Sequence, residues 1–513
     1  FAGAGGGGIP LPPEPSCDPA AQGSATVAAP ELTLTLYDRW EEAWLGSAAI
    51  VDLEGDGQNE IVVPRADKMY AFDGSGAVKW KFEGASGRIW ASPLVADFRD
   101  DAALETVFAA RSQIYMLDAA GNVLSGFPVT WQDEIRSIGG GDVDGDGQLD
   151  IVVATTNAGS AGDVLHAFGA NGAPIAGFPP MGSGTSGCEA DDRCYLAGAF
   201  DQNVAVGDLN DDGLHDVIVP HDNAYASIHS GTGEAFDAHE GFPSVKTPGV
   251  RYLHDLALSQ QGWANDEETA LQAHFTNTPP AIADVDGDGS YEVVMLASVQ
   301  NASQNDRLKG VAVWVVRHDA SRLTAFDPPV HMPDYLAGLW DLGDNIVAST
   351  NQATVADLDP TRPGMEIVFP GFDGRIHAVS ASGEPLWFFS YTTDPEVLSG
   401  GVAVADLSGD GVPEVVFNSY STADDQSALF ILDAGGNLLH EIALPRRGAM
   451  PVPTIGDLEG DQQLEIVVSL KDADDGVESV LVYTVPGSSD NCLLWPTGRG
   501  NLLRNGWIRT AQN

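Results

Sequence analysis

The stretch IGGGDVDGDGQLDIVV, residues 138–153, decides the fold of this chain. Within it, a nine-residue loop that starts at Asp142 carries aspartates at its first, third, fifth and ninth positions, and glycine at its sixth. Apolar and β-branched residues stand directly after the loop, as they do in a β-strand. The stretch therefore predicts two short strands joined by a tight acidic turn.

This pattern recurs eight times along the chain. Fixed spacing of one pattern is the sequence signature of a repeat architecture. The steps between copies run from 45 to 76 residues, which suits a four-stranded blade with connections of variable length. The copies begin at Asp52, Asp97, Asp142, Asp208, Asp284, Asp357, Asp406 and Asp457.

Each copy belongs to a longer unit, and the first unit shows its parts. Strands are expected at residues 48–51, 60–63, 69–72 and 78–82, with a Gly-containing turn before the last. Eight antiparallel meanders in series predict a single all-β domain, a β-propeller of eight four-stranded blades, with seven blades as the alternative. A ring leaves only short, protected strand edges, which favours a propeller over an open stack. The alternating stretch at residues 31–37 is expected to pair with the last blade and close the ring.

Composition excludes several classes of function. Asp and Glu total 74 against 24 Lys and Arg, a formal net charge of −50, so nucleic acid and anionic membranes are not expected as partners. With 43% hydrophobic residues the chain can bury a core, and no apolar run is long enough to span a bilayer.

Residues 1–30, rich in Gly, Pro and Ala, are expected to form a tail before the propeller at 31–513. The start of the sequence lacks a signal-peptide pattern, which indicates a processed chain.

Four cysteines form an even set without the spacing of a zinc site. Cys188 and Cys194 are close enough in sequence to close a small loop, and Cys17 and Cys492 would then pair by elimination. The second bridge would tie the two ends of the chain and stabilise the closed ring by about 3 to 5 kcal/mol on a chain-entropy model. Disulfides predict an extracellular or cell-surface location, with the periplasm as a further possibility.

The acidic loops are predicted to bind several Ca²⁺ ions. Calcium takes six to eight oxygen ligands, which closely spaced carboxylates on a tight turn supply. The alternative for any one loop is an Asp-Gly turn held by its own hydrogen bonds. Repetition favours metal, because unneutralised carboxylates at this density repel one another. The predicted ligands are Asp52, Glu54, Asp56, Glu60; Asp142, Asp144, Asp146, Asp150; Asp208, Asn210, Asp212, Asp216; Asp284, Asp286, Asp288, Glu292; Asp406, Ser408, Asp410, Glu414; and Asp457, Glu459, Asp461, Glu465.

Three loops depart from the pattern. The last has Gln462 where glycine is expected. The loop at Asp97 has Arg99 at its third position, where a guanidinium is positioned to replace the cation by bridging nearby carboxylates. The loop at Asp357 carries an insertion at residues 360–364. We assign no ion to the loops at Asp97 and Asp357.

The acidic motif, followed by Ile-Val-Val and a Gly-rich hairpin, resembles the FG-GAP and VCBS-type repeats, as in the propellers of integrin alpha subunits. The resemblance covers residues 48 to about 485. It implies calcium-binding loops on an extracellular recognition platform. Because repeat families host many functions, it names no ligand.

The topology suggests where a ligand would bind. All acidic loops should lie on one face of the propeller, and the long insertions at 180–203, 244–279, 298–310 and 331–352 on the other, as a cap. Loops on a rigid scaffold commonly carry binding residues. The cap offers aromatic and polar side chains for a glycan or protein partner, although large aromatics more often form a core. These candidates are Arg251, Tyr252, His254, Trp263, Tyr335 and Trp340.

The sequence thus favours a recognition, adhesion or assembly module over an enzyme. No nucleophile elbow or His-Glu-x-x-His motif is present, so no catalytic residue is assigned. Two alternatives remain. One is a structural subunit of an extracellular filament or surface layer, which self-associates through the N-terminal tail. The other is a polysaccharide lyase that uses a basic residue of the cap, such as Arg251 or His254.

Overall fold

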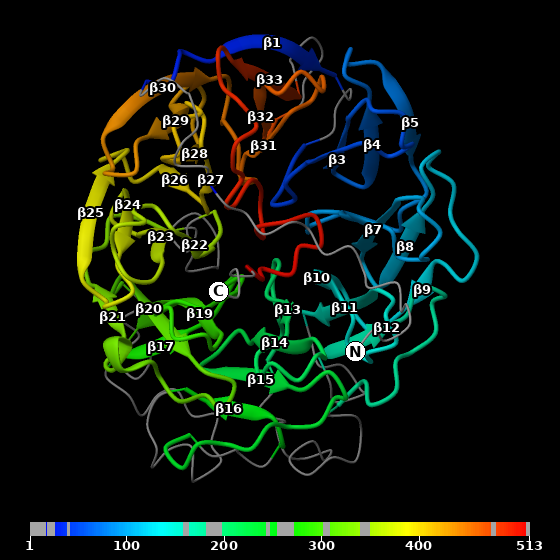
Figure 1. Ribbon diagram of the computed structural model, residues 1–513, viewed down its shortest axis with the longest axis vertical. Coiled ribbons are helices and arrows are strands. Elements are labelled where there is room, and N and C mark those ends of the chain that lie inside the picture. Colours follow the sequence, from blue (N-terminus) through cyan, green and yellow to red (C-terminus); the bar gives the residue numbers. More distant parts are fainter. Residues whose placement is uncertain are drawn as a thin grey trace, which may run out of the picture.

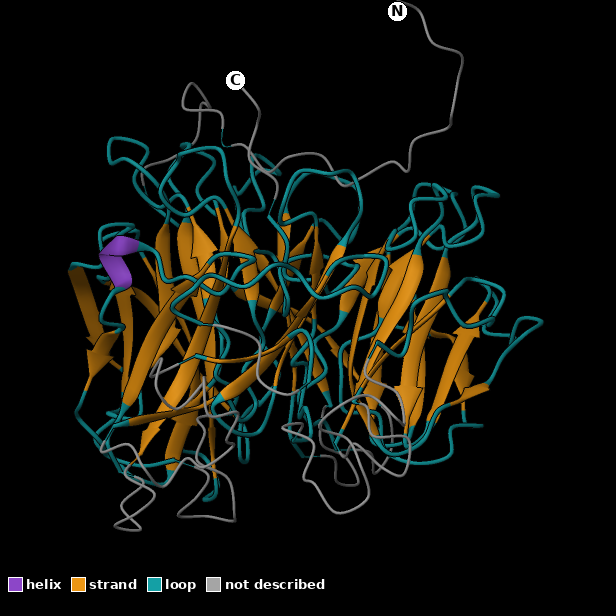
Figure 2. Ribbon diagram, turned by 90° about the horizontal axis from the view of Figure 1, so that it is seen from below, coloured by secondary structure: helices purple, strands orange, loops and turns teal. Residues whose placement is uncertain are grey.

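A computed structural model describes residues 17, 26–37, 42–156, 164–180, 197–242, 247–253, 271–300, 308–338, 349–472 and 479–508 of the chain. In this part of the chain eight antiparallel sheets are arranged as the blades of one propeller (Figure 1), which confirms the predicted fold and the blade count. Seen from the side, the strands run between two faces that carry the connecting loops (Figure 2). Cys188 and Cys194 lie outside the described residues.

Every blade is a meander with its first strand nearest the axis, although blade 3 keeps only three strands. Blades 1 to 4 are β2 (Ala49–Val51), β3 (Glu60–Arg65), β4 (Lys68–Phe72), β5 (Val78–Phe82); β6 (Leu94–Ala96), β7 (Glu105–Ala110), β8 (Gln113–Leu117), β9 (Val129–Thr130); β10 (Ile135–Gly141), β11 (Asp150–Thr155), β12 (Leu165–Phe168); and β13 (Ala205–Gly207), β14 (Asp216–Pro220), β15 (Tyr225–His229), β16 (Val250–Tyr252).

Blades 5 and 7 each add one strand to the meander. Blades 5 to 8 are β17 (Gln272–His274), β18 (Ala281–Ala283), β19 (Glu292–Gln300), β20 (Val311–Val316), β21 (Val330–Met332); β22 (Thr354–Ala356), β23 (Glu366–Pro370), β24 (Arg375–Val379), β25 (Pro385–Ser390); β26 (Val397–Ser399), β27 (Ala403–Ala405), β28 (Glu414–Ser421), β29 (Ser427–Leu432), β30 (Leu438–Leu444); and β31 (Thr454–Gly456), β32 (Leu464–Ser469), β33 (Val480–Val485) with β1 (Glu31–Leu36). A short 3₁₀ helix, η3 (Thr324–Phe326), precedes β21.

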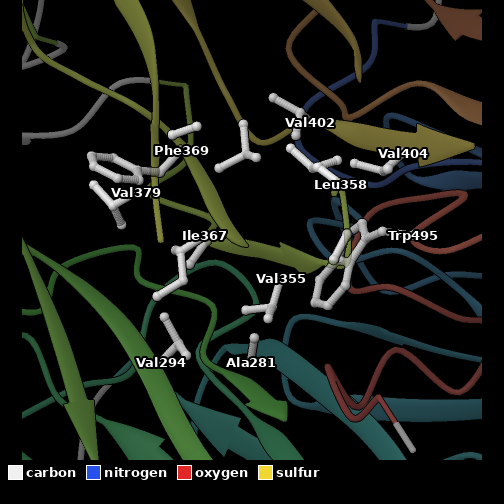
Figure 3. Packing of buried hydrophobic residues seen from close by; sticks show 14 of the residues in the cluster. Ala281, Val294, Val355, Leu358, Ile367, Phe369, Val379, Val402, Val404 and Trp495 are labelled. Carbon is white, nitrogen blue, oxygen red and sulfur yellow. The ribbon is translucent and has the colours of Figure 1, made fainter. Parts of the chain in front are cut away.

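Burial follows position in the blade. Strands β3 and β23, the second strands of their blades, are mainly apolar and are buried along their whole length. The outermost strand β25 instead alternates exposed and half-buried residues, because only one of its faces packs on the core. Side chains from adjacent blades interdigitate between the sheets, and one such core contains Val355, Ile367 and Trp495 (Figure 3).

Outer strands also link neighbouring blades through glycine. Trp80 in β5 packs over Gly121 of the blade 2 hairpin, and its indole Nε1 donates to Ala119 O at 2.9 Å. Trp387 in β25 repeats this contact with Gly436 of blade 7, donating to Ala434 O at 2.9 Å. A Cβ atom on either glycine would lie within 3 Å of the indole, so the contact requires glycine.

The ring closes as the sequence predicted. The N-terminal strand β1 pairs antiparallel with β33, from Glu31 opposite Thr484 to Leu36 opposite Val480, and forms the outermost strand of blade 8. A disulfide joins Cys17 to Cys492 across 475 residues of sequence. Both ends of the repeat region are therefore fixed to the last blade.

The C-terminal segment, residues 491–508, was not predicted to have structure. It lies across the centre of the ring (Figure 1, red) and hydrogen-bonds to all eight blades. It accepts the backbone N–H of innermost-strand residues in six of them, at 2.8 to 3.1 Å: Val95, Gly140, Val206, Ile282, Val404 and Ile455. Thr497 Oγ1 donates to Ala48 O of blade 1, and the Arg499 N–H donates to Gln352 Oε1 of blade 6. The segment thus pairs backbone groups that the blades leave free at the axis.

Two fully buried arginines complete this central segment. Arg504 donates to the backbone oxygens of Pro93, Gly498 and Ala48 at 2.8 to 2.9 Å, and to Thr497 Oγ1 at 2.8 Å. Arg499 donates to the backbone oxygens of Pro280 and Val204. Together they connect blades 1, 2, 4 and 5 at the axis.

We expect Arg504→Met to destabilise the protein by about 3 kcal/mol or more, because several buried acceptors lose their donor. The measurement is guanidinium unfolding followed by tryptophan fluorescence. Arg446→Met is the control, since the Arg446 side chain is 42% exposed and its ion pair with the exposed Asp424 spans 3.6 Å. Equal stability of the two variants would contradict a structural role for the axial segment.

Candidate metal centres

Each acidic loop leads into the long buried strand of its blade, and the acidic residue that ends the loop, the ninth in seven loops and the tenth, Glu366, in blade 6, has the same contact in all eight. One oxygen of its carboxylate accepts the backbone N–H of the residue that follows the first aspartate, at 2.7 to 3.1 Å. In blade 3, Asp150 Oδ2 accepts the Val143 N–H at 3.0 Å. This acidic position therefore holds the loop on its second strand whether or not an ion binds.

The first aspartate folds the loop on itself. In blade 3, the two carboxylate oxygens of Asp142 accept the N–H groups of Gly145 at 2.8 Å and Gly147 at 3.1 Å. Asp52, Asp208 and Asp457 make equivalent bonds in their loops. Gln462 of blade 8 adopts the left-handed conformation (φ 73°) and donates to Asp457 Oδ2, as glycine does elsewhere. The turns are thus preformed by their own hydrogen bonds.

Two loops additionally bring three carboxylates within reach of one ion. Ligand oxygens of Asp142, Asp144 and Asp146 lie within 4.8 Å of one another, as do those of Asp284, Asp286 and Glu292 in blade 5. In the blade 5 loop, Asp284 Oδ1 and Glu292 Oε1 are buried without a hydrogen-bond donor, although Arg317 Nε lies 3.8 Å from Glu292 Oε1. Buried polar atoms normally have a partner, so these oxygens fit metal ligands.

The raised carboxyl pKa values of the acidic loops also fit cation sites. Burial, with a smaller contribution from the neighbouring Asp144, raises the pKa of Asp150 to about 8. Burial likewise raises the pKa of Glu292 to about 8, with Asp286 adding to the shift. Three more ninth-position carboxyls have a pKa raised to about 8 with burial as the largest cause: Asp216, Glu414 and Glu465. A bound cation would offset this cost of ionisation.

Blade 1 contains a cation of its own. The Lys79 ammonium, which comes from the outer strand β5, lies 2.7 Å from Glu54 Oε2 and 2.6 Å from Glu60 Oε1. Hydrogen bonds to these two carboxylates raise the pKa of Lys79 against the opposing effect of burial. Glu54 and Glu60 are two of the predicted ligands, so a metal ion in this loop would compete with the lysine.

The other unusual loops also have internal partners. Arg99 donates to Ser125 O at 2.8 Å rather than forming the expected bridge between the carboxylates of its loop. In blade 6, Arg362 pairs with Asp359 at 3.0 Å, while Asp357 Oδ1 is buried without a donor. In blade 7, Asn491 of the axial segment donates to Asp406 Oδ2 at 2.6 Å, which ties that loop to the centre of the ring.

The structure places only part of the predicted cap. His254, Trp263 and Trp340 lie outside the described residues. Arg251 and Tyr252 are fully buried, Arg251 donating to Phe236 O at 2.6 Å and Tyr252 packing on Tyr225 at 4.9 Å between centroids. These two side chains belong to the core of blade 4 and present no surface to a ligand. Burial removes the large apolar surface of Tyr252 from water, which is the usual outcome for an aromatic side chain. Tyr335 is half-buried and packs near Phe372.

Sequence reasoning missed a ladder of alternating cations and aromatic rings. It crosses blades 8, 1, 2, 3 and 4 at residues close to the innermost strands, with cation-to-centroid distances of 3.2 to 5.5 Å. Its members, in spatial order, are Lys471, Trp44, Arg88, Trp90, Arg136 and Phe200. The sequence offered one signal, a tryptophan shortly before each of β2 and β6. The contact between Lys471 and Trp44, however, joins residues 427 positions apart and forms only when the ring is closed.

We expect Lys79→Met to lower stability without calcium, because Glu54 and Glu60 lose their shared cation. Calcium should then stabilise this variant more than the wild type, since the loop becomes a free carboxylate site. The measurement is the melting temperature with calcium and with chelator. The matched control is Lys81→Met on the same strand, whose partner is the exposed Glu83. An identical calcium response in both variants would show that Lys79 does not substitute for an ion.

Comparisons with known proteins address the family and the fold. A family model described as the FG-GAP repeat matches residues 135–166, which comprise β10, the acidic loop and β11 of blade 3 and extend into β12. The comparison with curated proteins gives no significant match.

Solved structures share the overall architecture at low identity. The V. cholerae biofilm matrix protein Bap1 is 15% identical with a TM-score of 0.55, over 94% of this chain and 96% of that one. The exotype rhamnogalacturonan lyase YesX is 14% identical with a TM-score of 0.53, over 92% and 80%. Sqt1 of Saccharomyces cerevisiae is 10% identical with a TM-score of 0.51, over 89% and 100%. At such identities the likeness concerns the fold alone.

The repeat match, the recurring acidic loop and the ring of eight sheets agree with one another. The chain is an eight-bladed β-propeller built of FG-GAP-type repeats.

Proposed function

We propose that this protein is a calcium-binding propeller that works outside the cytoplasm as a recognition or assembly module. The observation that carries the proposal is the blade 5 loop. There, Asp284 Oδ1 and Glu292 Oε1 are buried without a donor, and Asp286 lies close enough to share an ion with them. Oxygen-only ligands on a preformed loop suit a hard cation, and several carboxylates at flexible geometry suit calcium better than magnesium.

The covalent chemistry supports the proposed location. The Cys17–Cys492 disulfide is consistent with an oxidising compartment. No helix among the described residues has the length and hydropathy needed to cross a membrane. An extracellular or cell-surface location, with the periplasm as the alternative, agrees with the bridge.

Recognition or assembly fits the architecture better than catalysis. The propeller is rigid, with a closed ring, a filled axis and loops on two faces, which is how binding surfaces are commonly held. A solved protein with this fold over nearly its whole length is a biofilm matrix protein. The lyase alternative rests on the shared fold of a rhamnogalacturonan lyase. One of its two suggested basic residues, Arg251, is fully buried.

Calcium is expected to raise the melting temperature, because binding to the folded state alone adds about 2.7 kcal/mol at a concentration one hundred times Kd. In calorimetric titration, Asp144→Asn with Asp146→Asn should bind one ion fewer than the wild type. The control is Asp237→Asn with Glu240→Gln, which removes the same charge from two exposed residues outside the acidic loops. A melting temperature that chelator does not change would contradict the calcium proposal.

Assembly through the N-terminal tail is tested by light scattering in millimolar calcium. Polymers of the full chain that disappear in a chain beginning at Glu31 would identify the tail as an assembly device. Because that truncation also removes Cys17, a Cys17→Ser, Cys492→Ser variant separates loss of the bridge from loss of the tail. If every form is a monomer, the function is recognition, and ultraviolet absorbance of unsaturated products from acidic polysaccharides tests the lyase alternative.

A further inference from the structure

The outer rim of the propeller has a hollow of about 620 Å³ beside blade 6, within the size range of ligand pockets. Its lining residues come from the end of β21 and the two residues after it in blade 5, from Asp373, β24 and β25 in blade 6, and from hairpin residues 435–437 of blade 7. Strands β21, β24 and β25 lie toward the rim at the left of Figure 1.

One wall of the hollow is an exposed aromatic ring. Phe388 in β25 is 58% exposed, the largest value among the exposed large hydrophobic residues. The strand register places it opposite His377 of β24, with Arg375 two residues earlier on the same face. The Arg375 guanidinium lies 4.7 Å from the centroid of the Phe388 ring.

The polar wall is an interlocked network. The Asp373 carboxylate, only 5% exposed, accepts from Arg375 Nη1 at 3.0 Å and lies 3.0 Å from His377 Nε2. Arg375 also donates to the carboxylate of Asp334, which is 70% exposed, at 3.2 Å. The network holds donors and acceptors in fixed positions beside the ring. It sets two carboxylates against one guanidinium beside the histidine, so it offers no net attraction to an anion.

Two other blades have a charged residue at the register position that Phe388 occupies in blade 6. The register position of Phe388 is occupied by Lys81 in blade 1, opposite Tyr70, and by Glu441 in blade 7, opposite Phe430. Lys81 lies 5.2 Å from the Tyr70 ring and pairs with Glu83. The aromatic ring at this place is therefore particular to blade 6: it packs on the Arg375 guanidinium and leaves 58% of its surface open to a ligand.

We propose that this hollow binds a neutral hexopyranose unit of a polysaccharide. The apolar C–H face of a pyranose packs on Phe388, while adjacent hydroxyls donate to the Asp334 carboxylate and accept from Arg375. A neutral sugar meets no charge repulsion at these carboxylates, whereas a uronate carboxylate would meet Asp334 and Asp373. The inference rests on the recognition function proposed above and names its ligand class.

The test uses the full, disulfide-bonded chain in millimolar calcium. Neutral gluco-, galacto- and manno-oligosaccharides are titrated by calorimetry, with oligogalacturonate as the anionic probe. We expect at least one neutral probe to bind, Phe388→Ala to weaken it tenfold or more, and Phe388→Tyr to restore it. Leu438→Ala is the matched control, a 43% exposed residue on the outer strand of blade 7, and should bind as the wild type does.

The other outcomes overturn the proposal in distinguishable ways. Neutral-sugar binding that Phe388→Ala leaves intact would place the glycan site elsewhere and leave the recognition function standing. Binding of oligogalacturonate alone, or of no probe, would refute a neutral-sugar site. The calcium titration and light scattering do not involve Phe388, so they report on the proposed function independently.

Discussion

The unpaired backbone edge at the axis of the ring is the constraint on which the structure depends. The first strand of each blade is hydrogen-bonded on one side, and its other edge faces the centre. Buried N–H and C=O groups without partners are costly, and eight blades bring eight such edges together. Residues 491–508 supply the missing partners, and the buried Arg499 and Arg504 bind carbonyl oxygens from four blades. A segment that belongs to no repeat thus completes the hydrogen bonding at the inner edges of the blades.

The same need to pair backbone N–H groups explains the acidic loops. A loop that turns sharply at the end of a buried strand has N–H groups without sheet partners, and carboxylates accept them. The first and ninth residues serve this purpose, as Asp142 and Asp150 illustrate. The third and fifth carboxylates also accept N–H groups of the loop: Asp144 Oδ1 accepts the Asp146 N–H at 3.2 Å, and Asp146 Oδ1 accepts the Gln148 N–H at 2.8 Å. The acidity of the motif therefore serves a structural requirement of the loop, beside the cation binding proposed for it.

Differences between blades, rather than the repeat itself, indicate where function resides. Lys79 supplies blade 1 with an internal ammonium, and Asn491 ties the blade 7 loop to the axis, whereas the blade 5 loop keeps two buried oxygens without donors. On the outer rim, Phe388 replaces the charged Lys81 and Glu441 of the equivalent positions. Each exception changes the chemistry of one blade while the scaffold stays the same.

The sequence by itself determined the repeat, the eight blades, the acidic loops and the closing strand at residues 31–36, because these depend on local patterns of hydrophobicity, turn residues and spacing. It also determined the Cys17–Cys492 pairing, by elimination within a small set. Only the tertiary structure decided that Arg251 and Tyr252 are core residues, that Lys79 reaches Glu54 and Glu60, and that the C-terminal segment fills the axis. Burial and partner choice depend on which strands lie side by side once the ring has closed, and no local pattern carries that information.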